Sequence, residues 1–235
     1  MLAIAVAALA ALALAGCTTG HPDNRAPVAS IAADRDHAAT QDVFTFDAGS
    51  SNDPDGQVTS WLFEFGDGNR TLIEAPDQPK AEHAYATGGA YQVTVTVRDD
   101  GRDGQGVGRR EDEALMSVHV EQTFAMAGQV LQATAPPLDV QSNYTKEWDV
   151  APSADEQVLN LSMRGLLLAG RSVIELEFLD PTGHVLEAQT YDLDGSQNVT
   201  VHLRVPLASS GLHALRITAE EGGASFDGDV TVRYG

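Results

Sequence analysis

The stretch "SWLFEFGDGNR", residues 60–70, decides how the rest of the sequence is interpreted. Aromatic side chains recur at every second position of its first half: Trp61, Phe63 and Phe65. This is the period of a strand with one buried face. Gly66 and Gly68 then flank Asp67; glycine permits backbone angles that side chains forbid, and an Asp in a turn bonds amides further along the chain. The stretch predicts a strand that ends in a tight corner, with a structural role for Asp67 and no catalytic one.

Similar alternating segments, bounded by turn-rich stretches, occur throughout the first half of the chain. They are residues 28–33, 43–48, 60–65, 90–97 and 114–120. Short strands with a turn about every ten residues indicate an antiparallel β-sandwich. The 22 glycines and 10 prolines of the chain fit the many turns of an all-β protein.

The order of these motifs resembles that of a PKD domain, an immunoglobulin-like β-sandwich, over residues 25–121. The motifs are "APVASI", "FDAGSSNDPDGQVTSW", "FEFGDG" and "HAYATGGAYQVTVTVRDDG", followed by a last strand. The family usually has Trp and Asp where this chain has Phe63 and Glu64, so a smaller ring must fill the core. The resemblance implies structural roles for His83 and Tyr85, with the ring of Tyr85 buried and its hydroxyl bonded to the backbone.

Some PKD domains bind calcium at one end of the sandwich, and the resemblance brings Asn24, Asp53, Asp55 and Asp99 to that end. Ca²⁺ takes six to eight oxygen ligands, and an empty carboxylate cluster would repel itself. The alternative is that "DPDG" is a type I turn and that Asp99 caps a strand. Calcium is therefore the one cofactor that the sequence suggests, and the purely structural alternative stays open.

The second half, residues 122–235, continues in the same style after a crossover at residues 121–144. Its alternating segments are residues 144–150, 157–164, 172–179, 185–193, 198–205, 211–219 and 229–234. About eight strands without helices predict a second β-sandwich of jelly-roll type. The order is similar to that of small jelly-roll domains attached to secreted prokaryotic proteases. The predicted fold class is all-β, with two tandem β-sandwiches.

The chain opens "MLAIAVAALAALALAGC", with an apolar run of roughly 14 residues, shorter than the ~20 of a membrane-spanning helix. Such a run is typical of a signal peptide, here residues 1–16. The single cysteine, Cys17, follows Leu-Ala-Gly, which resembles the lipobox of prokaryotic lipoproteins. The resemblance implies that Cys17 carries lipid, palmitate included, and that residues 17–24 form a tether. No Lys or Arg precedes the run, so either the true start lies upstream or the signal lacks its usual positive end. The alternative to lipidation is an ordinary signal peptide or an uncleaved anchor.

Four of the six asparagines lie in the acceptor pattern for N-glycosylation: Asn69, Asn143, Asn160 and Asn198. The pattern suggests a glycoprotein exported from a cell that glycosylates its surface. The alternative is strand composition, because strands favour Thr and thereby create the same pattern by chance.

The composition and the absence of catalytic motifs narrow the function. The formal net charge of −20, from 34 acidic and 14 basic residues, repels phosphate backbones and argues against nucleic acid as a partner. No histidine pair has the spacing of a zinc-protease helix, and neither a nucleophile elbow nor a phosphate-binding loop is present. These observations predict a protein that is not an enzyme.

The sequence therefore predicts a cell-surface lipoprotein, anchored by lipid to the outer face of the membrane or envelope. Its PKD domain is expected to act in binding, adhesion or spacing, through contacts with an extracellular protein or polysaccharide. An accessory protein that captures substrate for a secreted hydrolase is the alternative, and an enzyme of unrecognised type is the third.

Overall fold

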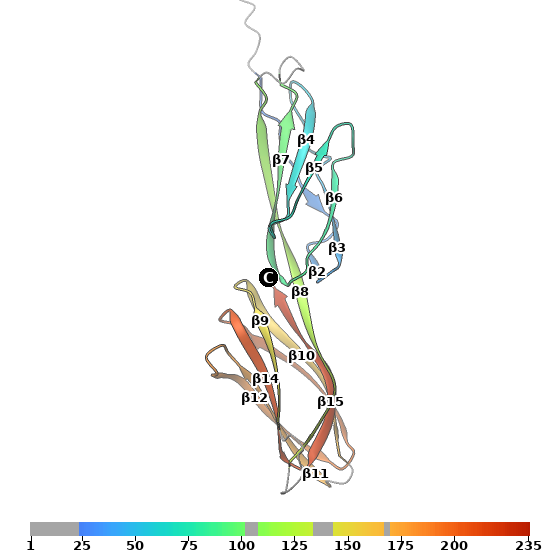
Figure 1. The fold of residues 1–235 in the computed structure, drawn as a ribbon, viewed down its shortest axis with the longest axis vertical. Coiled ribbons are helices and arrows are strands. Elements are labelled where there is room, and N and C mark those ends of the chain that lie inside the picture. Colours follow the sequence, from blue (N-terminus) through green and yellow to red (C-terminus); the bar gives the residue numbers. More distant parts are fainter. Residues whose placement is uncertain (1–23, 102–107, 134–142, 167–169) are drawn as a thin grey trace, which may run out of the picture.

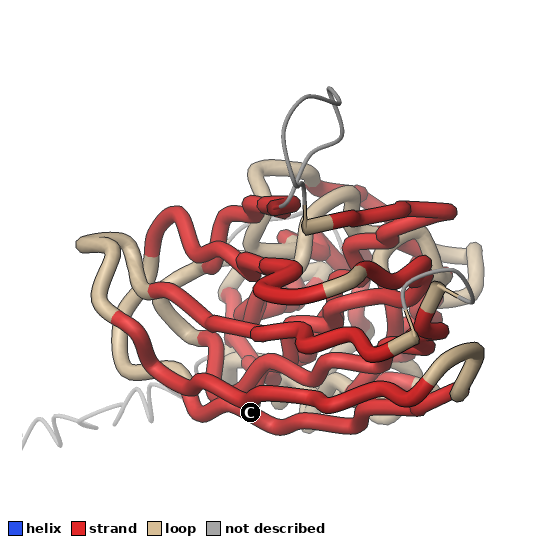
Figure 2. Tube along the Cα trace, turned by 90° about the horizontal axis from the view of Figure 1, so that it is seen from below, coloured by secondary structure: helices blue, strands red, loops and turns tan. Residues whose placement is uncertain are grey.

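The computed structural model describes residues 24–101, 108–133, 143–166 and 170–235. The predicted signal peptide, Cys17 and most of the predicted tether lie outside these residues. The described parts contain fifteen strands and no helix, which confirms the all-β prediction (Figures 1 and 2). It follows that none of the described segments is a helix that could cross a membrane.

The first sandwich consists of two facing sheets. One sheet has the order β1 (Ala32–Ala33), β3 (Val43–Asp47), β6 (Lys80–Ala84). The other is formed by β2 (His37–Ala39), β8 (Glu111–Gln132), β7 (Gly89–Asp99), β4 (Val58–Glu64) and β5 (Arg70–Glu74). All pairs are antiparallel except β2 with β8, which is parallel. The short β5 is the last strand of its sheet.

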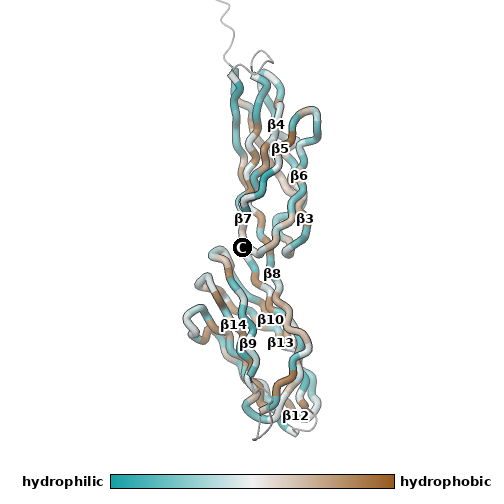
Figure 3. Tube along the Cα trace, in the orientation of Figure 1, coloured by the Kyte–Doolittle hydropathy of each residue, from teal (hydrophilic) through white to brown (hydrophobic). Residues whose placement is uncertain are grey.

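Aromatic rings fill the core of the first sandwich. Its largest buried side chains are Phe44, Phe46, Phe63, Phe65 and Tyr85. Valines from β7 and β8, which belong to the same sheet as Phe63, complete the core. Because the side chains of a strand point alternately to its two faces, Phe63 and Phe65 are buried while the intervening Glu64 is exposed. Figure 3 shows the resulting alternation of hydrophobic and hydrophilic segments along the strands.

The second sandwich uses the distal half of β8 and seven further strands. These are β9 (Asn143–Val150), β10 (Ala154–Gly165), β11 (Arg171–Leu179), β12 (Val185–Asp194), β13 (Asn198–Pro206), β14 (Gly211–Glu221) and β15 (Gly223–Tyr234). One sheet has the order β13-β10-β15-β8 and the other β12-β11-β14-β9. The antiparallel pairs are nested in sequence: β8 with β15, β9 with β14, β10 with β13, and β11 with β12. This nesting is the topology of a jelly roll, as the sequence predicts.

One strand belongs to both sandwiches. β8 pairs with β7 up to Val120 and with β15 from Gln122 onward, so a single sheet runs through both halves (Figure 1). Residues 121–144, expected from the sequence to form a crossover, are strand up to Gln132. The expectation was wrong for residues 121–132 because their backbone hydrogen bonds are made with β15, a strand from the far end of the chain. The local sequence carries no sign of that partner.

Side chains brace the two sandwiches around this shared strand. The Gly88 amide donates to Oε1 of Gln122 at 2.9 Å, and Arg233 of β15 lies 3.3 Å from Glu121. A Cβ at Gly88 would lie 2.7 Å from Cβ of Gln122 and 2.9 Å from the ring of Tyr234, so the two sandwiches approach one another closely at a glycine. A continuous ladder with braces on both sides holds the sandwiches as one elongated body (Figure 1).

Candidate functional site

The Gly-Asp-Gly corner that follows β4 is built around two glycines in the left-handed region. Gly66 has φ +84° and Gly68 has φ +92°. A Cβ at Gly66 would lie 2.6 Å from the carbonyl oxygen of Gln92, whereas a Cβ at Gly68 would meet nothing within 4 Å. Gly66 therefore serves both the turn and the close approach of β7, while Gly68 serves the turn alone.

Asp67 holds this corner through both carboxylate oxygens. Its Oδ1 accepts from the Asn69 amide at 3.0 Å, and its Oδ2 accepts from Nε2 of His83 at 2.8 Å. Burial acts to raise the pKa of Asp67, but the bonds from Asn69 and His83 outweigh it and hold that pKa below its ordinary value. Asp67 is therefore an ionised carboxylate whose hydrogen bonds fix the conformation of the turn.

The two other residues of the motif complete a stacked aromatic unit. The His83 ring stacks on Phe65 with centroids 4.2 Å apart, and its edge meets Tyr85. The Tyr85 hydroxyl donates to the Phe65 carbonyl at 2.9 Å, and burial strongly raises the pKa of that hydroxyl. The pair of His83 and Asp67 thus packs against the rings of Phe65 and Tyr85, and the Tyr85 hydroxyl is engaged with the Phe65 carbonyl.

At the opposite end of the strands, the four residues of the suggested calcium site lie near one another. Asp99 is fully buried; its Oδ2 accepts from Nδ2 of Asn24 at 2.6 Å, and its Oδ1 accepts from the amides of Gly101 and Arg110. These bonds tie the beginning of the domain to the connection between β7 and β8. Asp99 is already satisfied by protein donors.

Asp53 and Asp55 are less completely bonded. Asp55 accepts from the Arg25 amide, and Oδ1 of Asp53 accepts from the Asp55 amide at 3.2 Å. The second oxygen of Asp53 is buried and has no hydrogen-bond partner among the described residues. Burial raises the pKa of Asp53, and the nearby charges of Asp55 and Asp99 raise it further. This orphaned oxygen is the feature of the acidic end that a cation would relieve.

Sequence reasoning missed one member of the acidic end, Asp100. Its Oδ1 accepts from the Gln57 amide at 3.2 Å. A Cβ at Gly56 would lie 2.5 Å from Asp100 and 2.6 Å from Asp53, so the turn passes between two carboxylates at a glycine. The signal was present in the "DDG" that ends β7. The described residues nevertheless contain no group of three or more His, Cys, Asp or Glu side chains arranged as a metal site.

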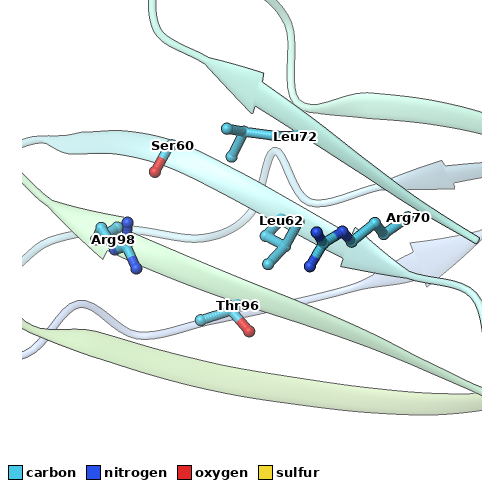
Figure 4. Close-up of a pocket in the computed structure, with 6 residues that line it drawn as sticks. All are labelled: Ser60, Leu62, Arg70, Leu72, Thr96 and Arg98. Atoms are coloured by element: carbon cyan, nitrogen blue, oxygen red, sulfur yellow. The ribbon is translucent and has the colours of Figure 1, made fainter.

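The outer face of the β5-β4-β7 sheet carries a shallow groove of about 460 Å³ (Figure 4). Its lining residues are Ser60, Leu62, Arg70, Leu72, Thr96 and Arg98. Leu62 lies between the two arginines, and Arg70 extends toward it from β5 (Figure 4). Arg98 is paired with Glu111 at 2.5 Å. An aliphatic floor with cationic rims is unusual on a chain with net charge −20, which makes this face a candidate contact surface.

The four predicted glycosylation asparagines occupy different settings. Asn69, Asn143 and Asn198 are exposed and lie in a turn or at the beginning of a strand. Asn160 lies in the middle of β10, where its Nδ2 donates to Asp229 at 3.2 Å and its Oδ1 is bonded to His202. A glycan would be attached to the Nδ2 that now donates to Asp229, so this asparagine differs from the three exposed ones.

Comparison with known proteins agrees with the geometry of the first sandwich. Residues 24–118 match the model of a PKD domain family. Together with the buried Phe63, the glycine corner and the tyrosine hydroxyl bonded to the backbone, this match defines the class of the first half: residues 24–118 are a PKD domain. The chain as a whole is a PKD domain followed by a further β-sandwich.

Individual relatives and solved structures are similar to parts of this chain. A microbial collagenase of Vibrio alginolyticus is 36% identical over 32% of this chain and 9% of its own length. The crystal structure of the PKD1 domain from the Vibrio cholerae metalloprotease PrtV is 26% identical, with a TM-score of 0.32, over 41% of this chain and 98% of that domain. A structure of carbohydrate-binding modules of the β-sandwich superfamily is 16% identical, with a TM-score of 0.37, over 88% of this chain and 97% of its own. This chain matches less than a tenth of the length of the collagenases.

Proposed function

We propose that this protein is a non-catalytic binding or spacer module of the cell surface. The observation that carries the proposal is the strand shared by the two sandwiches, β8, which makes one braced body from two domains. A body of this kind can hold its loops and sheet faces at a set distance from an attachment point. Collagenases and a pre-pro-metalloprotease carry similar PKD domains, which supports an exported location.

The attachment point in this proposal is a lipid on Cys17, after removal of residues 1–16. The anchor would hold the first sandwich nearest the membrane, on the outer face of the cell. Mass spectrometry of the N-terminal peptide from a membrane fraction tests this. A lipid-modified peptide that begins at Cys17 is the expected result, and an unmodified peptide with a different first residue would contradict it. The same digest reports whether Asn69, Asn143 and Asn198 carry glycans.

The proposed contact surface is the groove on the outer face of the PKD sheet. A Leu62→Asp variant places a charge on its aliphatic floor, and Leu212→Asp is the matched control because Leu212 of β14 is 50% exposed on the other sandwich. We expect the full chain to bind immobilised collagen or a cell-surface polysaccharide saturably, and we expect the Leu62 variant alone to lose at least tenfold in affinity. Equal binding by both variants would exclude this face as the contact surface. Absence of saturable binding to collagen and to cell-surface polysaccharide would contradict the binding role.

A second candidate function is an accessory protein that captures substrate for a secreted hydrolase. The relatives favour it, because their PKD domains belong to collagenases and metalloproteases. Addition of the full chain to a collagenase lacking its own PKD domain distinguishes the two functions. A substrate-capture protein increases the rate on insoluble collagen and leaves the rate on a soluble peptide unchanged, whereas a spacer changes neither rate.

We also propose that the acidic end of the PKD domain binds Ca²⁺. The support is the buried Oδ2 of Asp53, which has no partner among the described residues and lies near the carboxylates of Asp55 and Asp99. To join the site, Asn24 would turn its amide oxygen toward the ion in place of the Nδ2 that now donates to Asp99. Millimolar Ca²⁺ is expected to raise the melting temperature, because an ion that binds only the folded state stabilises that state. Asp53→Asn is expected to abolish the rise, and Asp227→Asn, on the other sandwich, to preserve it. No shift in the unmodified chain would discard the site.

A further inference from the structure

The edge strand β5 has backbone groups that no other described strand uses. Its register with β4 is flanked by bonds from the Phe65 amide to Asn69 and from the Ala75 amide to Thr59. Hydrogen-bonded pairs recur at every second residue of an antiparallel ladder. The even-numbered residues of β5 therefore direct their amide and carbonyl groups away from β4, toward the free edge of the sheet.

These outward-facing residues are Arg70, Leu72 and Glu74. The Glu74 carbonyl accepts from the Asp77 amide within the following turn. The backbone groups of Arg70 and Leu72 have no hydrogen bond to another described residue on that side. An exposed strand edge of this kind is a template for pairing with a further strand.

The side chains of Arg70 and Leu72 line the groove on the outer face (Figure 4). Glu74 lies on the same face of the strand, because it is two residues beyond Leu72 and pairs with Ser60. Leu72 is 57% exposed and is the most exposed large hydrophobic residue in the described part of the chain. Neither Arg70 nor Glu74 forms an ion pair with any described residue, although seven other basic side chains of the types Arg and Lys do: Arg35, Lys80, Arg98, Arg171, Arg204, Arg216 and Arg233. The edge thus presents a cation, an aliphatic side chain and an anion at regular intervals.

This order is complementary to itself. If a second β5 is placed antiparallel to the first about a twofold axis at Leu72, each Arg70 lies opposite the Glu74 of the other copy. The two Leu72 side chains then lie opposite one another. Cross-strand pairs of opposite charge and of aliphatic residues are the pairs that stabilise antiparallel sheets.

We propose that two copies of this chain associate through their β5 edges, which joins their PKD sheets into one continuous sheet. The Leu72 positions form a hydrogen-bonded pair at the twofold axis, and each Arg70 turns from Leu62 toward the carboxylate of the other chain. The edge itself carries one positive and one negative charge, so it is neutral within a molecule of net charge −20. The association goes beyond the binding role proposed above and does not require it.

A five-residue edge belongs to the weak, transient class of interfaces. We therefore expect a dissociation constant on the order of 10–100 μM at physiological salt, where the long-range repulsion of the acidic surfaces is screened beyond about 8 Å. Sedimentation velocity of the full chain in mild detergent, over a concentration series, measures it.

Charge exchange provides the decisive experiment. Arg70→Glu and Glu74→Arg each place like charges opposite one another, and each is expected to weaken self-association at least tenfold. A mixture of the two variants restores opposite charges at both positions, so donor- and acceptor-labelled variants are expected to show energy transfer only when mixed. The double variant R70E/E74R is expected to associate with itself like the unmodified chain.

Matched controls separate this interface from others. Arg164→Glu makes the same charge change on the exposed face of β10 and should leave association unchanged, and thermal melting verifies that all variants fold. A monomer at all concentrations up to about 500 μM would overturn the proposal. A dimer that is indifferent to the single β5 variants, or one that the mixture does not restore, would also overturn it and would assign association to another edge. The effect of Leu62→Asp on polymer binding tests the proposed function, and the β5 charge variants test the dimer. The two proposals can therefore fail separately.

Discussion

The two sandwiches share a strand but differ in how their polar and apolar groups are distributed. On the jelly roll, polar side chains of the outer sheet bond one another across strands: Asn160 bonds both Asp229 and His202, and Thr123 bonds Thr231. On the PKD sheet, Leu72 is exposed and Arg70 has no ion-pair partner among the described residues. Both faces expose single apolar side chains, Leu72 at 57% and Val130 at 56%. The PKD face differs in that Arg70, without an ion-pair partner among the described residues, lines a groove together with Leu62.

The two cores differ as well. The PKD core is built from stacked and edge-to-face aromatic rings, while the jelly-roll core relies on aliphatic side chains and methionine with fewer rings. Aromatic pairs add orientation to burial, so the PKD core holds the glycine corner in one geometry. The contrast indicates that the first sandwich depends on a few specific contacts and the second on many interchangeable ones.

The largest expected effects come from the two cores. Phe63→Ala and Phe178→Ala each remove a fully buried ring and are expected to destabilise their own sandwich by about 3–5 kcal/mol. Trp61 and Trp148 report on the two halves separately, so single-tryptophan versions followed by fluorescence in urea resolve the two transitions. Equal shifts of both transitions in both variants would show instead that β8 makes the sandwiches unfold as one unit.

The two glycines of the corner sharpen the comparison within the PKD domain. Gly66→Ala is expected to cost about 3 kcal/mol or more, because strain at positive φ adds to a clash with the Gln92 carbonyl. Gly68→Ala meets only the strain, about 1 kcal/mol. Urea unfolding of both variants measures the difference. Similar losses of stability in the two variants would mean that β7 shifts to accommodate the added methyl group at position 66. The close approach to the Gln92 carbonyl would then contribute little to stability.

The next effect concerns the carboxylate of the corner. Asp67→Asn weakens the bonds to Asn69 and His83, and we expect a loss of about 1–2 kcal/mol at pH 7. Because the folded pKa of Asp67 is lowered, its contribution is present above the unfolded pKa of about 3.9 and is lost as the pH falls through the folded pKa. The difference in free energy of unfolding between the variant and the unmodified chain should therefore be smaller at pH 3 than at pH 7. An equal difference at the two pH values would contradict this.

The smallest effect is expected at the joint between the sandwiches. Gln122→Ala removes one bond to the Gly88 amide and should cost about 1 kcal/mol or less, with no change in the small-angle scattering profile. A three-residue Gly-Ser insertion between Glu121 and Gln122 interrupts β8 and should broaden that profile. If the single substitution alone broadens it, the braces rather than the shared strand hold the two halves together.

Apart from the second half of β8, the sequence predicted the long strands well, because their pattern is local. In β7, Val93, Val95 and Val97 are all fully buried, and this period is visible without knowledge of any neighbour. The short strands β2, β5 and β6 were not predicted, because so few residues show no clear local alternation. β5 buries none of its five residues fully, so its only evidence is the partner strand.

The candidate sites divide in a similar way. The corner at Asp67 could be inferred because glycines, an acid and a downstream amide lie within a few residues. The bond from His83 to Asp67 and the place of Asp100 beside Asp53 depend on strands that meet only after folding.

By itself, then, the sequence determined the all-β class, the alternating strands and the turns between them, since each follows from the preferences of adjacent residues. Only the tertiary structure decided that β8 would join both sandwiches and that β5 would remain an open edge. Strand pairing connects residues such as Thr123 and Thr231, which are 108 positions apart. The backbone groups that make such pairs are the same in every residue, so the choice of partner comes from the packing of the whole core.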